Sequence, residues 1–84
     1  MKIEMYSKKN CSYCYSARKI LSENNIEFTE YKLTEDFTRE QLLEKVPLAK
    51  TYPVILVDDN FIGGFSDLKQ LLENKNVIWK RHSS

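Results

Sequence analysis

The chain has 84 residues, a net charge of +1 and a hydrophobic fraction of 42%. This length supports one domain around one core, and the patterned apolar content excludes an intrinsically disordered chain. The balanced charge disfavours nucleic-acid binding, and no apolar run approaches the roughly 18 to 20 residues that span a bilayer. The N-terminus also lacks the hydrophobic stretch of a secretory signal, so we expect a cytoplasmic protein with no nucleic-acid or membrane partner.

The first half of the chain alternates between the two periods of regular secondary structure. Ile3 and Met5 alternate with polar neighbours as in a strand, whereas Ala17, Ile20 and Leu21 recur at helical spacing. A T-x-x-Q capping box begins a second helix at its threonine. We expect a strand at 2–6, a helix from Ser12 to about Asn24, a strand at 26–33, and a helix from Thr38 that Pro47 ends.

The second half predicts a β-hairpin followed by a helix. The expected elements are a strand at 54–57, a turn at 58–60 into Phe61 and Ile62, an end of pairing at Gly63-Gly64, and a helix capped by Ser66 with Leu68, Leu71 and Leu72 as its apolar stripe. The tail from Asn74 offers Val77, Ile78 and Trp79 for packing on the core, and we expect 80–84 to fray. This order, β-α-β-α-β-β-α, predicts an α/β fold with a mixed four-stranded sheet flanked by three helices, in one domain (1–84, core about 2–74, tail 75–84).

The C-S-Y-C segment is expected where the first strand gives way to a helix. Cys11 falls at the helix N-terminus, where free backbone N–H groups and the helix dipole favour an anion, and Lys8 adds positive charge. Cys14, one turn further on, faces the same side and can attack a mixed disulfide formed at Cys11. These two residues are therefore the candidate nucleophile and resolving thiol of a redox site.

Two other roles for the cysteine pair compete with this interpretation. Free cysteines are often simply buried in a core, although the polar residues before Cys11 disfavour deep enclosure. A closed zinc site needs four ligands, and the chain offers only Cys11, Cys14 and the single histidine, His82. A zinc site shared between two chains stays open at this point.

Two further segments have features of a ligand site. In T-Y-P-V, Pro53 directly precedes a strand, which fits either an ordinary strand start or a cis bond that turns the Tyr52 backbone outward. In G-G-F-S-D-L, glycines let a ligand approach the backbone, and the next helix offers N–H groups to a carboxylate. A hairpin end with a normal helix cap would have the same composition.

Together, K-K-N-C-S-Y-C, T-Y-P-V and G-G-F-S-D-L resemble the glutaredoxins, small members of the thioredoxin-fold superfamily. The three motifs follow one another in family order and at family spacing, from Lys2 to about Asn74. The resemblance implies a thioredoxin-like fold and a glutathione-dependent thiol–disulfide oxidoreductase that reduces protein disulfides and glutathione mixed disulfides. Tryptophan is absent before Cys11, unlike in thioredoxin itself, and the C-G-F-S motif of monothiol glutaredoxins is also absent.

The resemblance also assigns roles to individual residues. Cys11 becomes glutathionylated and Cys14 resolves, while Lys8 meets a glutathione carboxylate. The remaining glutathione-binding residues that it implies are Tyr13, Thr51, Tyr52 and the cis-proline Pro53 around the cysteinyl unit, and Gly64, Phe65, Ser66 and Asp67 around the γ-glutamyl end.

Ser12 departs from the commonest motif, which has proline there. In this family serine occurs in some members that bridge a [2Fe–2S] cluster between two chains with glutathione, so Cys11 as a cluster ligand in a cluster-bridged dimer is the alternative function. The leading hypothesis has glutathione as co-substrate, no metal and a monomer. Its partners are disulfide-containing or glutathionylated client proteins, with ribonucleotide reductase as one candidate client.

Overall fold

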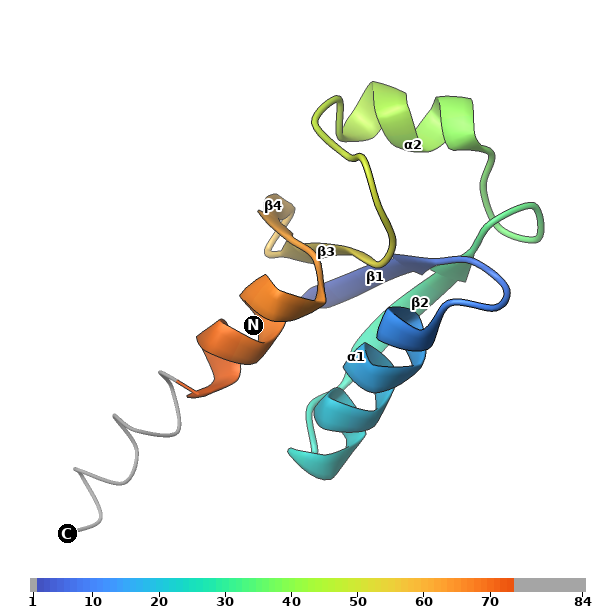
Figure 1. Cartoon of the computed structure of the whole chain (residues 1–84). Helices are drawn as coiled ribbons and strands as arrows, with labels where there is room; N and C mark the ends of the chain where they lie inside the picture. The colour runs from blue at the N-terminus through green and yellow to red at the C-terminus, as the bar shows by residue number, and fades with distance from the viewer. Residues whose placement is uncertain (1, 74–84) are drawn as a thin grey trace, which may run out of the picture.

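A computed structural model describes residues 2–73 of the chain (Figure 1). Four strands form one sheet in the order β2-β1-β3-β4, with β1 and β2 parallel and the β1–β3 and β3–β4 pairs antiparallel. The elements are β1 (Ile3–Ser7), α1 (Ser12–Glu23), β2 (Phe28–Lys32), α2 (Arg39–Lys45), β3 (Val54–Val57), β4 (Asn60–Gly63) and a C-terminal helix that covers residues 65–73. This confirms the mixed sheet with three helices and its thioredoxin-like topology.

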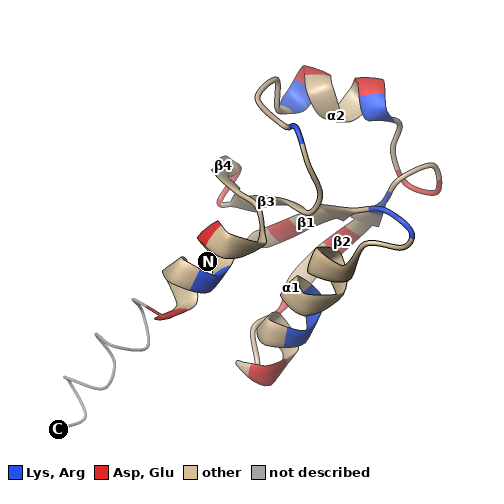
Figure 2. Ribbon diagram, viewed as in Figure 1, with Lys and Arg blue, Asp and Glu red and all other residues tan. Residues whose placement is uncertain are grey.

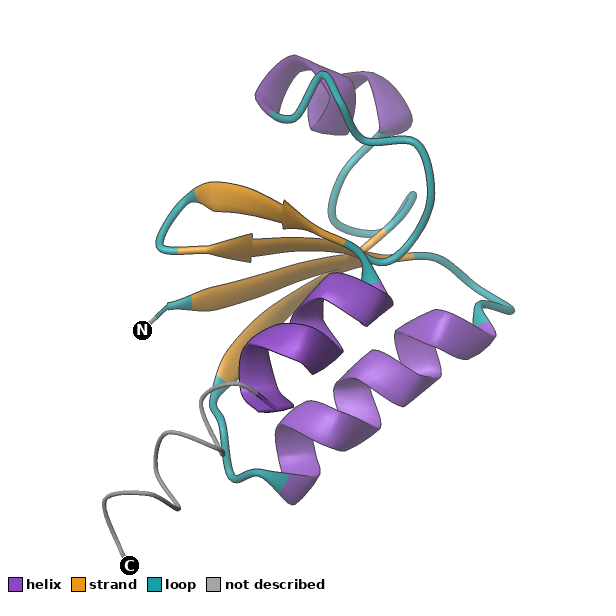
Figure 3. Cartoon of the chain, turned by 60° about the vertical axis from the view of Figure 1, so that its left-hand side comes forward, coloured by secondary structure: helices purple, strands orange, loops and turns teal. Residues whose placement is uncertain are grey.

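Two hydrophobic clusters, one on each face of the sheet, hold the layers together. On one face, Ile3 and Met5 pack against α1 and the C-terminal helix through Leu21 and Leu68, all fully buried. On the other face, Tyr6 and its neighbours meet Leu42 of α2 and Val46, which ends that helix. Figure 3 shows α2 on one side of the sheet and the two other helices together on the opposite side. Because every residue of β1 is buried, both faces of the central strand are covered.

Most element boundaries confirm the prediction. The capping box at Thr38 is present, since its hydroxyl accepts from the Gln41 N–H at 3.2 Å while the Gln41 side chain accepts from the Thr38 N–H at 2.8 Å. The hairpin turn has positive φ angles at Asp58 (50°) and Asp59 (68°), which bring the two strands back with the twist that a tight hairpin needs.

Four details of the prediction are wrong. β1 extends to Ser7, and β2 is shorter than the predicted 26–33 because Ile26 still belongs to the turn after α1, where its N–H bonds to the Leu21 carbonyl. Gly63 remains paired with Ile55 across a bulge. The last helix is capped at residue 64 and not by Ser66. The predictions for 74–84 lie outside the described residues. Within residues 2–73, no helix has the length and apolar character needed to cross a membrane.

Candidate active site

Cys11 is the N-cap residue of α1. The preceding Asn10 has a φ of 55°, which turns the chain sharply out of the loop after β1. Cys11 itself is extended, with φ −113° and ψ 105°, and its sulfur accepts a hydrogen bond from the Cys14 backbone N–H at 3.2 Å. A sulfur in this position receives the helix N–H groups that normally bind a capping oxygen or an anion, so the local geometry stabilises negative charge on it.

The two cysteines form a disulfide in this structure, with their Cα atoms 5.2 Å apart. Cys14 is 1% exposed, whereas Cys11 is partly exposed at the start of the helix. A molecule arriving from solvent therefore meets Cys11 first. The buried Cys14 lies within bonding reach of that sulfur, so the pair can alternate between dithiol and disulfide.

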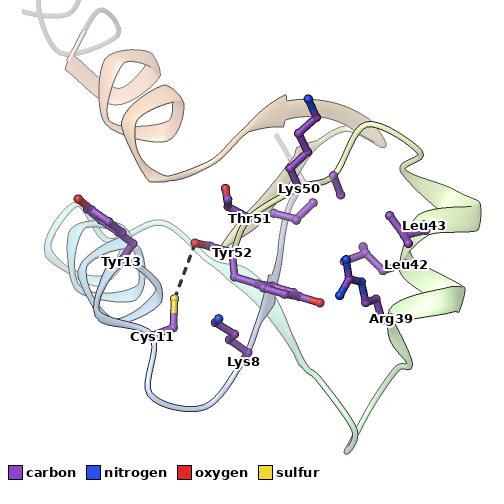
Figure 4. A pocket seen from close by; sticks show the side chains of 11 residues that line it. Lys8, Cys11, Tyr13, Arg39, Leu42, Leu43, Lys50, Thr51 and Tyr52 are labelled. Atoms are coloured by element: carbon purple, nitrogen blue, oxygen red, sulfur yellow. Dashed lines mark hydrogen bonds between the residues drawn. The ribbon is translucent and has the colours of Figure 1, made fainter.

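The Tyr52–Pro53 peptide bond is cis and faces the cysteines. The Cys11 sulfur lies 3.8 Å from the Tyr52 carbonyl oxygen (Figure 4). In the reduced protein the thiol can donate to this oxygen; in the disulfide, the sulfur carries no proton and the contact is only a close approach. Pro53 is fully buried, and its carbonyl oxygen lies 3.3 Å from the position that a Cβ on Gly64 would take. The glycine thus allows the cis-proline segment and the last helix to meet.

The C-terminal helix begins immediately after this contact. The Leu68 N–H bonds to the Gly64 carbonyl at 3.1 Å, and the Asp67 carboxylate accepts from the Gly64 N–H at 3.1 Å. Gly63 has a φ of 127°, and a Cβ there would overlap the Asp67 carboxylate. The backbone conformation therefore favours glycine at 63, whereas at Gly64 the close approach of Pro53 leaves little room for a side chain. Asp67 presents its exposed carboxylate at the helix start.

A hollow of about 340 Å³ opens beside the Cys11 sulfur. Figure 4 shows the Lys8 and Tyr52 side chains between Cys11 and α2. A second hollow of about 320 Å³ adjoins it, and the two share Tyr13, Thr51 and Tyr52. The second is completed by Gly64, Phe65, Ser66 and Asp67. We call the two together the cysteine cleft.

The cleft brings together nearly all the residues singled out in the sequence. Lys8, Cys11, Tyr13, Thr51 and Tyr52 line the first part, and Gly64 to Asp67 line the second. Tyr13 is 62% exposed and stacks on Phe65, with ring centroids 5.9 Å apart. Cys14 and Pro53 are buried and lie behind the lining.

Two cations of the cleft, Arg39 and Lys50, are not among the site residues predicted from the sequence. Arg39 is the first residue of α2, and Lys50 lies in the loop that leads to Thr51. Neither carries a motif, and only the placement of α2 over the end of the sheet brings them to the cysteines. With Lys8, whose Nζ lies 5.7 Å from the Tyr52 ring centre, they make the first part of the cleft cationic, and among the described residues 2–73 no carboxylate lines that part.

A sheet of this topology, with C-x-x-C at the first helix N-terminus and a cis-proline facing it, defines a thioredoxin-fold thiol–disulfide oxidoreductase. The sequence model of the glutaredoxin family matches residues 3–62. Glutaredoxin 3 of Escherichia coli K12 is 32% identical over 69 residues, which are 82% of this chain and 83% of that protein. A probable glutaredoxin of Synechocystis sp. is 34% identical over 71 residues, covering 83% and 81% of the respective chains. The chain therefore belongs to the glutaredoxin family.

Solved structures agree with this assignment. Glutaredoxin 1 from Francisella tularensis, complexed with cacodylate, superposes with a TM-score of 0.74 at 30% identity, covering 87% of this chain and 93% of that chain. A buckwheat glutaredoxin–glutathione complex also superposes with a TM-score of 0.74, covering 90% of this chain and 72% of that chain. Because its identity is 18%, this similarity supports the fold alone.

Proposed function

We propose that this oxidoreductase is glutathione-dependent, with Cys11 as its nucleophile and Cys14 as its resolving thiol. One observation carries the proposal: the half-buried sulfur of Cys11 caps a helix and opens onto a cleft that is cationic at one end and bounded by a second helix N-terminus at the other. Glutathione matches this arrangement, because it has a carboxylate at each end, an ammonium group and a central cysteinyl unit.

The cleft offers a complementary group for each part of that tripeptide. The glycyl carboxylate fits among Lys8, Arg39 and Lys50, and the cysteinyl backbone fits beside Tyr52. The γ-glutamyl end fits at the start of the last helix, where backbone N–H groups suit its carboxylate and Asp67 suits its ammonium group. The aromatic side chains of Tyr13 and Phe65 form the outer wall.

The chemistry begins with the Cys11 thiolate. It attacks the glutathione sulfur of a mixed disulfide, forming a new S–S bond while the client sulfur leaves with the electron pair and takes a proton from solvent. A second glutathione thiolate then attacks the bound glutathione sulfur and leaves with it as glutathione disulfide, which frees Cys11. For a client with its own disulfide, the Cys11 thiolate attacks one client sulfur, and the other leaves with the electron pair and takes a proton from solvent. Deprotonated Cys14 then attacks the Cys11 sulfur of this mixed disulfide, expels the remaining client thiolate and closes the Cys11–Cys14 bond, which two glutathiones later reduce.

Cysteine variants separate the two routes. We expect Cys11→Ser to abolish turnover of a small glutathione mixed disulfide, and Cys14→Ser to retain that turnover while losing reduction of a protein disulfide. Coupled glutathione-disulfide formation measures the first activity, and insulin reduction with glutathione measures the second. Retained turnover in the Cys11 variant would exclude the proposed nucleophile.

A third variant tests glutathione binding itself. Arg39→Gln removes one cleft cation and should raise the KM for glutathione about threefold, within the range for a partly exposed ion pair. When dithiothreitol, which lacks carboxylates, replaces glutathione as the reductant, the same variant should reduce the substrate disulfide at the wild-type rate. Arg39→Lys, which keeps the charge, is the matched control. An equal loss with both reductants would mean that Arg39 acts on the cysteines and not on glutathione.

The other functional expectations stay predictions. No group of three or more His, Cys, Asp and Glu that could hold a metal ion occurs within residues 2–73, and no observation favours the cluster-bridged dimer over the glutathione reaction. Glutathionylated and disulfide-bonded proteins as clients, ribonucleotide reductase among them, a cytoplasmic location and a monomeric state belong to the proposal.

A further inference from the structure

Cys11 also borders a third hollow, separate from the cysteine cleft, on the side of the active-site loop that faces β2. This hollow, of about 360 Å³, lies between α1, the loop 8–10 and the end of β2, and we call it the α1–β2 groove. Its lining includes Lys9, Tyr15, Arg18, Glu30, Lys32 and Glu35. The proposed glutathione site uses none of these six side chains.

The floor of the groove is electrically neutral. The Arg18 guanidinium binds the Glu30 carboxylate through two hydrogen bonds of 2.8 and 2.6 Å, and the buried Ser7 hydroxyl donates to the same carboxylate at 2.7 Å. The hydrogen bonds from Arg18, more than any other contact, hold the pKa of Glu30 below its ordinary range. These groups satisfy one another and leave no net charge for a ligand.

The walls of the groove are different. Lys9 and Lys32 are exposed, and within residues 2–73 neither forms an ion pair. Lys8 lies over the Tyr52 ring, on the side of the cysteine cleft. Lys9 and Lys32 line the groove, where Glu30 is already paired with Arg18 and Glu35 is the other carboxylate of the lining. Tyr15, 62% exposed, adds an aromatic surface on the helix side.

The same sign of charge surrounds the cysteine on both sides. Six Lys and Arg and two Glu line the hollows that border Cys11, a net charge of +4 against +1 for the whole chain. Figure 2 shows the basic residues of the active-site loop close to the end of β2. Such an asymmetry attracts a negatively charged partner and orients it with its reactive group toward the sulfur.

We propose that the α1–β2 groove binds an acidic segment of the client protein next to its glutathionylated cysteine. This rests on the proposed function: when the glutathione unit of a mixed disulfide fills the cysteine cleft, the client chain, which is joined to the glutathione sulfur, has to lie on another side of Cys11, and the groove borders Cys11 there. Acidic residues beside the client cysteine would meet Lys9 and Lys32, and an apolar side chain would meet Tyr15.

The test uses two peptides that carry one glutathionylated cysteine, flanked either by glutamates or by lysines, and a small uncharged glutathione mixed disulfide. We expect the wild-type kcat/KM to favour the acidic peptide by about threefold or more, and added salt to erode that preference. Lys32→Glu should lower kcat/KM for the acidic peptide by about threefold, whereas Glu35→Lys should raise it by a similar factor. Neither change should alter turnover of the small mixed disulfide.

The matched control is Lys69→Glu, an equal charge reversal at an exposed position of the C-terminal helix that lines neither the described cysteine cleft nor the α1–β2 groove. The proposal that the groove binds acidic clients would be overturned if Lys32→Glu and Lys69→Glu changed kcat/KM for the acidic peptide equally, or if the wild-type protein had equal kcat/KM values for the two peptides. A second assay distinguishes failure of the proposed glutathione reaction from failure of the groove proposal. There, the pre-reduced protein reduces, in a single turnover, two-cysteine versions of the peptides that have the same flanking charges and a closed intramolecular disulfide, which reports the preference for flanking charge without glutathione.

Discussion

Gly63 is a position where one side chain decides local geometry. Its φ of 127° is unfavourable for any residue with a Cβ, and that Cβ would also displace the Asp67 carboxylate from the Gly64 N–H. We expect Gly63→Ala to lower the free energy of unfolding by about 2 kcal/mol. Urea unfolding followed by circular dichroism measures this.

Gly64→Ala is the internal control for that substitution. Its Cβ would lie 3.3 Å from the Pro53 carbonyl oxygen, a tight contact without the adverse φ. A loss below about 1 kcal/mol is expected there. If the two variants were equally stable, the backbone conformation at Gly63 would not be the determining factor.

At the scale of elements, one ion pair ties α1 to β2. Arg18 on the helix and Glu30 on the strand form a bidentate pair, with 41% and 14% of their side chains exposed. Because the folded-state pKa of Glu30 lies below the ordinary value of 4.5, the pair stabilises the fold fully above that pH. The contribution is lost as the pH falls from there through the folded-state pKa.

We therefore expect Arg18→Gln to cost roughly 1 kcal/mol at pH 7, a value kept low by the solvent exposure of Arg18. The difference from wild type should shrink as the pH falls below 4.5 and Glu30 becomes protonated in both proteins. Unfolding in urea at a series of pH values measures this, with Lys19→Gln, the neighbouring exposed cation, as control. A difference that stays constant down to pH 2 would contradict an ionic origin.

The elements also show which features local sequence can predict. The capping box at Thr38 and the period of α1 depend on neighbouring residues, and both were predicted correctly. The start of the last helix was placed at Ser66, but Gly64 caps it, because the close approach of Pro53 and the side chain of Asp67 determine the backbone there. Ile26 has the alternation of a strand, yet the turn after α1 holds its N–H.

The candidate site likewise contains residues that could be predicted from local sequence and residues that could not. Its motif residues could be predicted because they lie in three short segments of recognisable composition. Arg39, Lys50 and the α1–β2 groove could not, because the surfaces they line exist only after α2 and β2 are placed against the sheet. Cys14 and Pro53 were found by motif, but their burial behind the cleft depends on the core.

For the molecule as a whole, the two faces of the sheet differ in how firmly they are held. α2 has seven residues, fewer than an isolated helix needs for stability, and Leu42 is its one fully buried residue. α1 has twelve residues and buries Cys14, Ala17 and Leu21. We expect α2 to open by local fluctuations that leave the rest of the fold intact.

Native-state hydrogen exchange tests this difference. The amides of Leu42 and Val46 should exchange with a smaller opening free energy, and a weaker urea dependence, than those of Met5 in β1 and Leu21 in α1. The β1 and α1 amides should exchange only through global unfolding. One common opening free energy for all four amides would show that α2 unfolds together with the core. Because Arg39 begins α2, its opening would also loosen one wall of the cysteine cleft.

The strand order has a consequence for how the protein behaves at high concentration. β2 and β4 are the outer strands of the described sheet, and an outer strand with unpaired backbone groups can recruit another chain and start aggregation. β4 is only four residues long and meets a bulge, whereas β2 is protected by charge, with exposed Lys32 at its end. Replacing this lysine by valine would remove that protection and invite intermolecular β-pairing, whereas glutamate would keep it. The residue proposed to select acidic clients thus also helps to keep the protein from self-association.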